Sequence, residues 1–213
     1  MRRTGRISSR FLVALGFSGL VLTALASVAG AATPTDEIQT QVARIRQALD
    51  EPALASPASA TDRHVAMLRL VGEVFDFGET ARRALGRHWE VRTPAERAEF
   101  VGLFTRLLEE SYLSKLEMYR DEGVTYLGDT IDRNEAVVRT RMVPARGAEM
   151  AIDYHMYLRS DRWRIYDVTV DGVSLVDNYR VQFNKIIETS SYANLIAKMQ
   201  ALGQGATPRK TSR

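Results

Sequence analysis

Apolar residues recur with two different periods along the chain, and the change between them separates a helical part from a strand part. Over residues 36–49 and 62–70 the apolar positions fall every three or four residues, as they do on one face of a helix. The same spacing returns over residues 81–89 and continues through a long stretch, 94–119. Beyond Gly123 the period shortens to two, which is typical of strands with one covered face.

Polar residues indicate where these helices begin. Residues 93–96 (TPAE) form a capping box with proline at the first helical position, so they predict a helix over residues 94–119. Residues 76–79 (DFGE) resemble a second capping signal. Between the first two helices, residues 52–60 are rich in alanine, serine and proline, a composition typical of a linker.

Four strands are predicted after the long helix, and the short gaps between the last three favour antiparallel hairpins. In the third strand, apolar side chains fall on one face, while Asp153 and His155 fall on the other. Such faces are expected of an antiparallel sheet that is covered on one side. Helices followed by a curved antiparallel sheet of about four strands and a closing helix imply an α+β fold. The predicted strands are 123–128, 136–144, 150–158 and 162–170.

Residues 166–183, YDVTVDGVSLVDNYRVQF, join the last strand to the closing helix. The first half alternates like a strand, and the second half has the spacing of a helix. Ser174 can cap this helix, with Asp177 three positions further on. We expect Gly172 to end the strand and to let the helix return across the same apolar face.

The first 32 residues have the character of a secretory signal peptide. Four arginines accompany an apolar run over residues 11–28, and small residues at 29–31 offer a cleavage site. An uncleaved membrane anchor is the alternative, since about 18 apolar residues come close to spanning a bilayer. We therefore expect a cleaved signal, an N-terminal helix with its linker, an α+β domain and a flexible tail. Their bounds are 1–32, 33–60, 61–202 and 203–213.

Charge and cysteine content narrow the classes of function. The whole chain carries +3, and removal of the four arginines in residues 1–32 leaves −1 for the mature protein. A body close to neutrality lacks the basic surface that nucleic acids require, so no nucleic-acid partner is expected. The chain has no cysteine, which excludes a lipid anchor, thiol catalysis and cysteine metal sites.

The sequence contains no obvious constellation for catalysis or for metal binding. The three histidines do not share the spacing of metal ligands, and residues 172–176 lack the second glycine of a nucleophile elbow. Asp167 and Asp171 could flank a substrate as paired carboxylates, but solvated strand and turn positions explain both. We expect neither an enzyme nor a bound metal or cofactor.

Of the functions considered, binding of a ligand by apolar surface remains. Aromatic and methionine side chains are aimed at the inner side of the sheet and helices, and methionine adapts to ligands that lack one fixed shape. The same side chains could simply fill a solid core, which composition alone favours. They are Phe100, Phe104, Tyr119, Met142, Met150, Tyr154, Met156, Tyr166, Tyr179 and Phe183.

Residues 166–183 resemble the C-terminal signature of the MlaC family, also called toluene-tolerance auxiliary proteins, and DGVSLVDNYR is the most specific part. The similarity extends over residues 36–201, nearly all of the mature chain. Further segments occur in the order of the family. They are VFDF at 74–77, ARRALGRHW at 81–89, the helix that starts at 93 with Phe100 and Phe104, and residues 112–119.

This resemblance implies a soluble periplasmic carrier of phospholipids in Gram-negative bacteria. The carrier would move lipid between an outer-membrane lipoprotein complex and an inner-membrane ABC transporter with its substrate-binding subunit. The implied fold is a strongly curved sheet with helices packed on it, enclosing an apolar cavity for the acyl chains. Arg180 is a candidate head-group contact, with a salt bridge near the helix start as the alternative. The lipid-binding positions carried over to this chain are Phe100, Phe104, Met142, Tyr154, Met156, Tyr166, Val168, Tyr179 and Phe183.

Energetics explain why such a carrier needs a cavity. Each methylene removed from water contributes about 0.8 kcal/mol, so two acyl chains hold a lipid in its membrane with on the order of 20 kcal/mol. A carrier has to offer comparable burial without an exposed apolar patch, which would cause aggregation. An enclosed space between sheet and helices meets both requirements.

Three other functions remain open at the level of the sequence. The chain could carry another lipid, such as a hopanoid, or it could be an interaction module with a solid core that holds an envelope complex together. It could also be an enzyme for a small ligand, although His155 on the polar face argues against this. Arg139, Arg141 and Arg159 on that face could form a docking surface, but solvated charge explains them as well.

Overall fold

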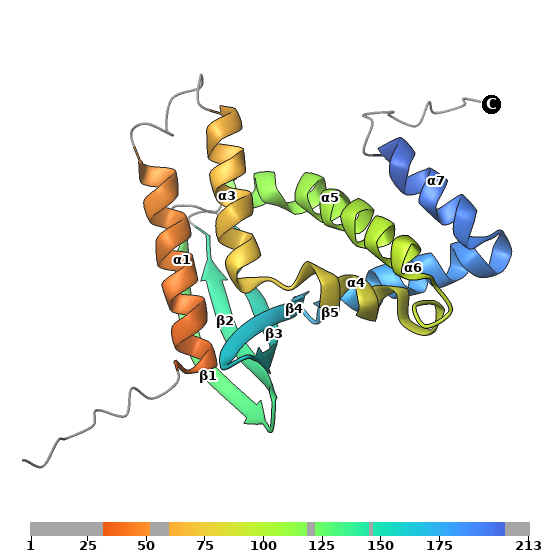
Figure 1. Ribbon diagram of the computed structural model, residues 1–213. Helices are drawn as coiled ribbons and strands as arrows, with labels where there is room; N and C mark the ends of the chain where they lie inside the picture. The colour runs from red at the N-terminus through yellow and green to blue at the C-terminus, as the bar shows by residue number, and fades with distance from the viewer. Residues whose placement is uncertain (1–31, 52–59, 119–121, 145–146, 203–213) are drawn as a thin grey trace, which may run out of the picture. The chain divides into compact units, whose positions relative to one another are not determined.

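The computed structural model describes residues 32–51, 60–118, 122–144 and 147–202, which Figure 1 shows as coloured ribbon. The chain divides after Gly30 into two units, and every described residue belongs to the second. The predicted signal peptide, linker and tail therefore fall almost wholly outside the described residues. Within these ranges, no helix is both long enough and apolar enough to cross a membrane.

The fold is α+β, as predicted: a five-stranded antiparallel sheet in the order β1-β2-β3-β4-β5, not closed into a barrel, packed with helices. One strand more than expected is present because residues 173–174 pair with β4. The helices are α1 (Pro34–Asp50), α3 (Ala60–Val74), α4 (Phe77–Leu85), the 3₁₀ turn η2 (Gly86–His88), α5 (Pro94–Met118), α6 (Leu175–Thr189) and α7 (Tyr192–Leu202). The strands are β1 (Gly123–Asp132), β2 (Glu135–Val143), β3 (Met150–Arg159), β4 (Arg162–Val170) and β5 (Val173–Ser174).

Strand β1 is longer than predicted because it passes through a bulge. The register with β2 shifts between Tyr126 and Gly128, and Gly128 adopts φ +100°, a conformation that glycine reaches without steric cost. The glycine expected to end the strand therefore bends it, and pairing continues to Asp132.

The chain also reverses differently from the prediction after β4. Asp171 and Gly172 both have positive φ, 47° and 81°, and Val170 pairs with Val173 across them. Two left-handed residues between paired strands are typical of the type I′ hairpin turn. The chain therefore pairs back as β5 before Ser174 caps α6, with its side chain accepting a hydrogen bond from the Asp177 backbone N–H.

Buried apolar side chains form two large clusters. The sheet cluster joins Ile38 of α1 and Val74 of α3 to inward-facing residues of β2, β3 and β4. The helical cluster is built by α4, α5, α6 and α7. In Figure 1, α1 and α3 stand side by side against the sheet, and the other helices continue from its β4–β5 side, where α4 and α6 contact β4.

Candidate functional site

The predicted lipid-binding residues on the helices come together. Phe100, Phe104 and Phe183 lie in the helical cluster, and the half-buried Tyr179 packs against them. The Phe104 ring lies 5.0 Å from that of Tyr179 and 5.2 Å from that of Phe183, both edge-to-face. Phe100 and Phe104 are at most 1% exposed, so they pack against protein on every side.

The predicted residues on the sheet form a separate group. Met156 belongs to the sheet cluster, with Tyr154 and Val168 half-buried against it. Tyr154 and Val168 are direct partners across β3 and β4, so they share one face, called here the inner face. Met142 points to the same face from β2, where it pairs with Met150.

The prediction that Tyr166 belongs to this face is wrong. A bulge in β4 pairs His155 with Asp167 and Met156 with Ile165, which leaves Tyr166 without a partner in the ladder. The Tyr166 ring packs instead near His155 and Tyr157, whose side chains alternate away from Tyr154. Tyr166 therefore lies on the outer face of the sheet.

The prediction that Asp167 is a solvated strand residue is also wrong. It is 7% exposed, and its carboxylate accepts hydrogen bonds from the Val176 N–H at 2.9 Å and from the Ser174 hydroxyl at 2.5 Å. A third hydrogen bond comes from the adjacent Val168 N–H. Buried carboxylates need such partners, and these bonds tie the start of α6 to β4.

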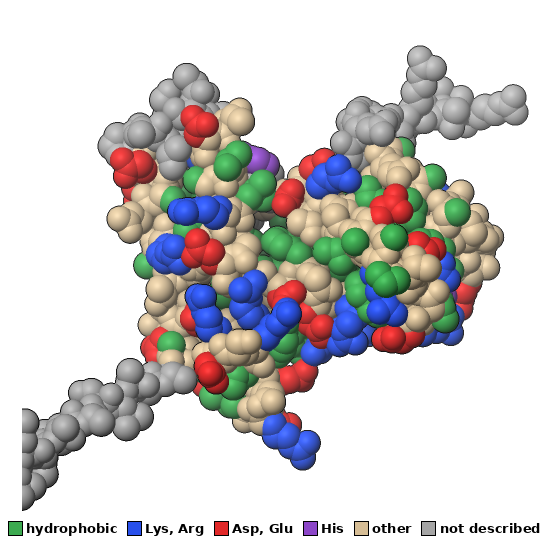
Figure 2. All heavy atoms as spheres, in the orientation of Figure 1, with side chains coloured by type: hydrophobic (Ala, Val, Ile, Leu, Met, Phe, Trp, Pro, Cys, Tyr) green, Lys and Arg blue, Asp and Glu red, His purple; other side chains and the backbone are tan. Residues whose placement is uncertain are grey.

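Burial along the inner face decreases toward one end of the sheet. Val138 and Thr140 of β2 are 0% and 1% exposed, whereas Met142, next on the same face, is half-buried. In β4, exposure rises from 5% at Ile165 to 41% at Val170. We call this end, defined by Val124, Met142, Met150 and Val170, the open end of the inner face. Figure 2 shows hydrophobic side chains gathered in a hollow between the part of the molecule that carries α3 and the part that carries α5.

Tyrosines that sequence reasoning missed stand beside the predicted ones. Tyr126 of β1 is half-buried, and it faces inward because it pairs with Thr140. Burial, together with Tyr126, raises the pKa of Tyr154 to about 12, so its phenol stays neutral. On α5, burial and the Tyr179 hydroxyl raise the pKa of Tyr112. The sequence does carry a signal for each tyrosine. Tyr126 follows Val124 by two positions, as on one face of a strand, and Tyr112 follows Leu108 by four, as on one face of a helix.

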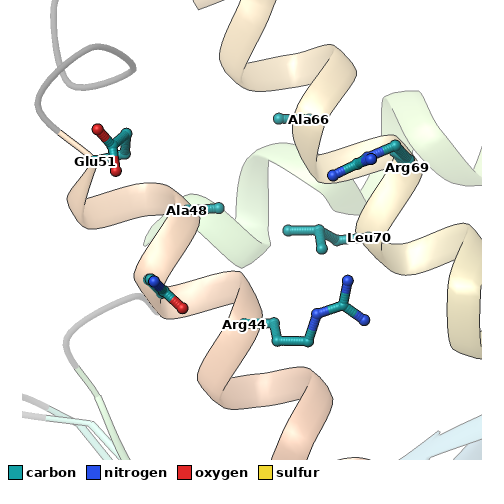
Figure 3. A pocket seen from close by; sticks show the side chains of 7 residues that line it. Arg44, Ala48, Glu51, Ala66, Arg69 and Leu70 are labelled. Carbon is teal, nitrogen blue, oxygen red and sulfur yellow. The ribbon is translucent and has the colours of Figure 1, made fainter.

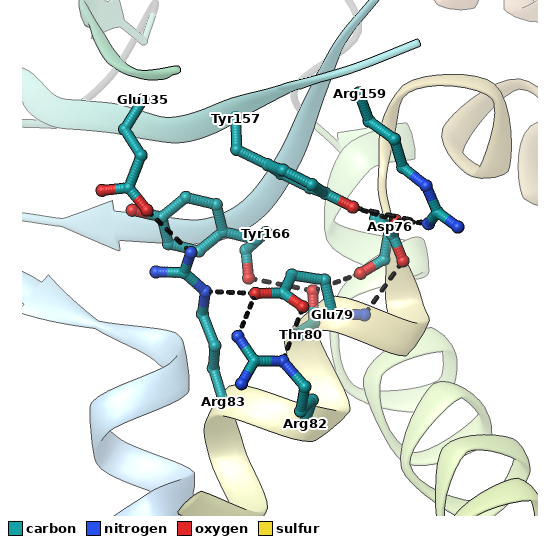
Figure 4. A network of polar contacts seen from close by, with 9 residues as sticks. All are labelled: Asp76, Glu79, Thr80, Arg82, Arg83, Glu135, Tyr157, Arg159 and Tyr166. Atoms are coloured by element: carbon teal, nitrogen blue, oxygen red, sulfur yellow. Dashed lines mark hydrogen bonds and ion pairs between the residues drawn. The ribbon is translucent and has the colours of Figure 1, made fainter. Parts of the chain in front are cut away.

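A polar network fixes α4 to the outer face, as Figure 4 shows. Asp76 caps α4, and its carboxylate also accepts hydrogen bonds from Tyr157 at 2.5 Å and Arg159 at 2.8 Å. Although burial raises the pKa of Asp76, these hydrogen bonds and that from the Glu79 N–H bring it below the usual value. The Thr80 hydroxyl adds a bond to the Tyr166 carbonyl oxygen at 2.9 Å.

Arg83 continues this network. Its guanidinium pairs with Glu79 at 2.7 Å and Glu135 at 2.8 Å, and lies 3.6 Å from the centre of the Tyr166 ring. The contact explains the position of Tyr166, whose ring covers a cation on the outer face. The network holds the helical cluster against the sheet, and so fixes the inner face relative to α5 and α6.

The other charged candidates have protein partners. Arg180 forms an ion pair with Asp177 at 2.6 Å, which is the alternative role that its position allowed. Arg139 donates to the Thr130 hydroxyl, and Arg141 pairs with Glu149 at 3.2 Å. Among the described residues, no group of three histidine or acidic side chains is placed to hold a metal ion.

Comparisons with known proteins find a family and a similar fold. The family model described as MlaC protein matches residues 39–201. The chain is 23% identical over 123 residues to the intermembrane phospholipid transport system binding protein MlaC of Haemophilus influenzae; the match covers 55% of this chain and 58% of that protein. The fold of this chain is similar to that of the phospholipid-binding protein from Ralstonia solanacearum, which was solved in complex with a phospholipid. That similarity has a TM-score of 0.68 at 23% identity, and covers 79% of this chain and 96% of the other.

Proposed function

Because the chain belongs to the MlaC family, we propose that it is a periplasmic carrier of phospholipid, which moves lipid between the outer and inner membranes. The observation that carries the proposal is the inner face of the sheet, whose apolar residues lose their cover toward Val170. A solid core would be covered along its whole length. The names of the Haemophilus and Ralstonia proteins support phospholipid as the ligand.

The acyl chains occupy the space between the open end of the inner face and the helices α5 and α6. Residues that retain exposed area can contact a ligand without repacking. Apart from Tyr166 on the outer face, the predicted ones are Met142, Tyr154, Val168 and Tyr179. Phe100, Phe104, Met156 and Phe183, at 0–4% exposure, form a second layer behind them. Tyr166 has no direct role, since its ring lies on the outer face.

The chemistry of this space suits acyl chains. Methionine and neutral tyrosine offer apolar area, and the pKa of about 12 keeps Tyr154 uncharged at any physiological pH. Flexible chains need no fixed set of hydrogen bonds. Burial at about 0.8 kcal/mol per methylene is the main attraction that the site has to provide.

The carrier exchanges its lipid with an outer-membrane lipoprotein complex and with an inner-membrane ABC transporter through its substrate-binding subunit. Family membership and the word intermembrane in the name of the Haemophilus relative support this route.

The test is the lipid content of the protein. The full chain, with its own first 32 residues, is expressed in a Gram-negative host, purified without detergent and extracted with organic solvent for mass spectrometry. We expect phospholipid in stoichiometric amount. A hopanoid in its place would support the related carrier. Protein that is lipid-free and also takes no lipid from phospholipid vesicles would contradict the proposal and favour the interaction module.

A further inference from the structure

A second hollow lies between α1 and α3, with a volume of about 320 Å³ (Figure 3). Pockets of this size are at the lower limit for small-molecule sites, so this one admits a side chain or two and not a whole lipid. Ala48 and Ala66 offer apolar surface, and Leu70, which is 6% exposed, lies beneath them in the lining. Figure 3 shows Arg44 and Arg69 reaching from the two facing helices toward the space beside Leu70. Gln47 and Glu51 complete the lining.

A buried glutamine holds the first arginine in place. Gln41 is 4% exposed, and its Nε2 donates to the Leu70 carbonyl oxygen at 2.6 Å. Its Oε1 accepts a hydrogen bond from Arg44 at 3.2 Å, and Arg44 also pairs with Glu73 at 2.5 Å. An amide buried between helices is costly unless both of its ends are bonded. Here both ends are bonded, and the arginine is fixed at the rim before any partner arrives.

The second arginine keeps its charge available. Within the described residues, Arg69 has no hydrogen-bond or ion-pair partner, and it acts on Glu73 only through its field. A hydrogen bond from Arg44, together with the positive charges of Arg44, Arg69 and Arg162, lowers the pKa of Glu73. Three cations thus surround Glu73, and they still outnumber Glu73 and Glu51 together, which leaves a local excess of positive charge.

This excess contrasts with the rest of the body. The whole chain carries +3, including four arginines in residues 1–32 and three basic residues in 203–213, so residues 33–202 carry −4. A negative body is repelled by an anionic bilayer. A single carboxylate can instead enter between the arginines. Charge complementarity therefore favours a protein over a membrane surface.

The geometry points to this hollow as the docking site of a protein partner, which places an aspartate or glutamate between Arg44 and Arg69 and an adjacent aliphatic side chain over Leu70. The inference rests on the proposed function, because a carrier has to dock on membrane complexes to exchange lipid. Opposite charges across such an interface fix orientation and raise the rate of association.

A photo-crosslinking amino acid at Gln47, an exposed residue of the lining, tests this in the native host with the full chain. We expect a protein crosslink whose peptide contains an acidic residue beside an aliphatic one. Arg69→Glu should reduce the crosslink about tenfold or more, and Arg69→Gln should reduce it less. Arg106→Glu is the matched control, because Arg106 is also an exposed helix arginine. Changing the partner's acidic residue to arginine should restore the crosslink to Arg69→Glu.

Lipid content, measured on the same proteins, separates this inference from carrier function. The docking site is supported if Arg69→Glu retains its phospholipid, loses the crosslink, and regains the crosslink when the partner's acidic residue is changed to arginine. The docking site is overturned if the wild type crosslinks to phospholipid alone or to no protein. It is also overturned if Arg69→Glu leaves the crosslink unchanged, or if charge reversal on the partner does not restore the crosslink. A wild-type protein without lipid but with a restorable crosslink would keep the docking site and contradict the carrier.

Discussion

The helical cluster and the inner face of the sheet use the same kinds of side chain but pack them differently. In the helical cluster, Phe100, Phe104 and Phe183 are 0–4% exposed, and their ring centres lie 5.2–5.8 Å apart. On the inner face, burial is complete at Val138 and is lost by Val170, which is 41% exposed. One region is a closed core, while the other is closed at one end only.

The difference follows from how helices and sheets are covered. Helices that cross one another can enclose an aromatic cluster from all sides, as α4 to α7 do. A sheet presents a broad face that needs cover along every strand, and α1 and α3 supply part of that cover, around Ile38, Val42 and Val74. A closed core and a candidate ligand site can thus be built from similar residues. Substitutions should distinguish the two, because they should change stability in one region and lipid binding in the other.

The largest effect is expected in the helical cluster. Phe104→Ala removes a ring that contacts three other aromatic rings, and the closed packing around it leaves a cavity. We expect the free energy of unfolding to fall by about 3–5 kcal/mol. Urea denaturation followed by circular dichroism measures this loss. A loss below about 1 kcal/mol would mean that the cluster is loosely packed, and the comparison with the sheet would fail.

Removing the cap of α4 should have the next largest effect. Asp76→Ala deletes the helix cap and the acceptor for Tyr157 and Arg159. We expect a loss of about 2–3 kcal/mol in the same unfolding experiment, from one cap and a charged hydrogen bond. Asp177→Ala, at an exposed carboxylate near the start of α6, is a control that should cost less. An equal loss in both variants would show that the network on the outer face adds nothing.

The same carboxylate predicts a smaller dependence of stability on pH. The folded state lowers the pKa of Asp76, so this contribution is complete above the unfolded value, about 4, and disappears as pH falls through the folded value. The stability difference between wild type and Asp76→Asn should therefore shrink between pH 7 and pH 3. Paired urea titrations measure it, and the subtraction removes the contribution of Glu79, whose pKa is also lowered. A difference that is constant with pH would contradict this role of Asp76.

Local signals made the helix starts predictable. The capping box at Thr93 and Glu96 forms with both reciprocal hydrogen bonds, and Asp76 and Ser174 cap their helices as their sequences indicate. These bonds join residues three positions apart, so the sequence that encodes them is short. The strands from β2 to β4 were likewise predictable from alternation, to within one residue at each end.

The face of Tyr166 was not predictable, because the bulge that turns this residue outward depends on pairing with His155 and Met156. The alternation of apolar and polar residues within the strand does not indicate the bulge. The candidate site residues were chosen by residue type, because large apolar side chains build a core and a lipid site alike. The residues that keep exposed area are set by where α1 and α3 stop covering the sheet. That depends on contacts between residues far apart in the sequence, so the sequence did not indicate Tyr126 as a site residue.

The smallest effect on stability, and the most informative one, is expected at Val168. This side chain is half-buried on the inner face, whereas Val138 on the same face is 0% exposed. Val138→Phe has to overpack the sheet cluster and should cost about 1–3 kcal/mol, while Val168→Phe should cost less than about 1 kcal/mol because its ring can extend into the open space. The second ring would occupy volume that the acyl chains need. Detergent-free Val168→Phe should therefore unfold like wild type and yet contain much less phospholipid by mass spectrometry. If Val168→Phe is instead as destabilised as Val138→Phe and keeps its lipid, the inner face is a solid core at this position, and the ligand lies elsewhere.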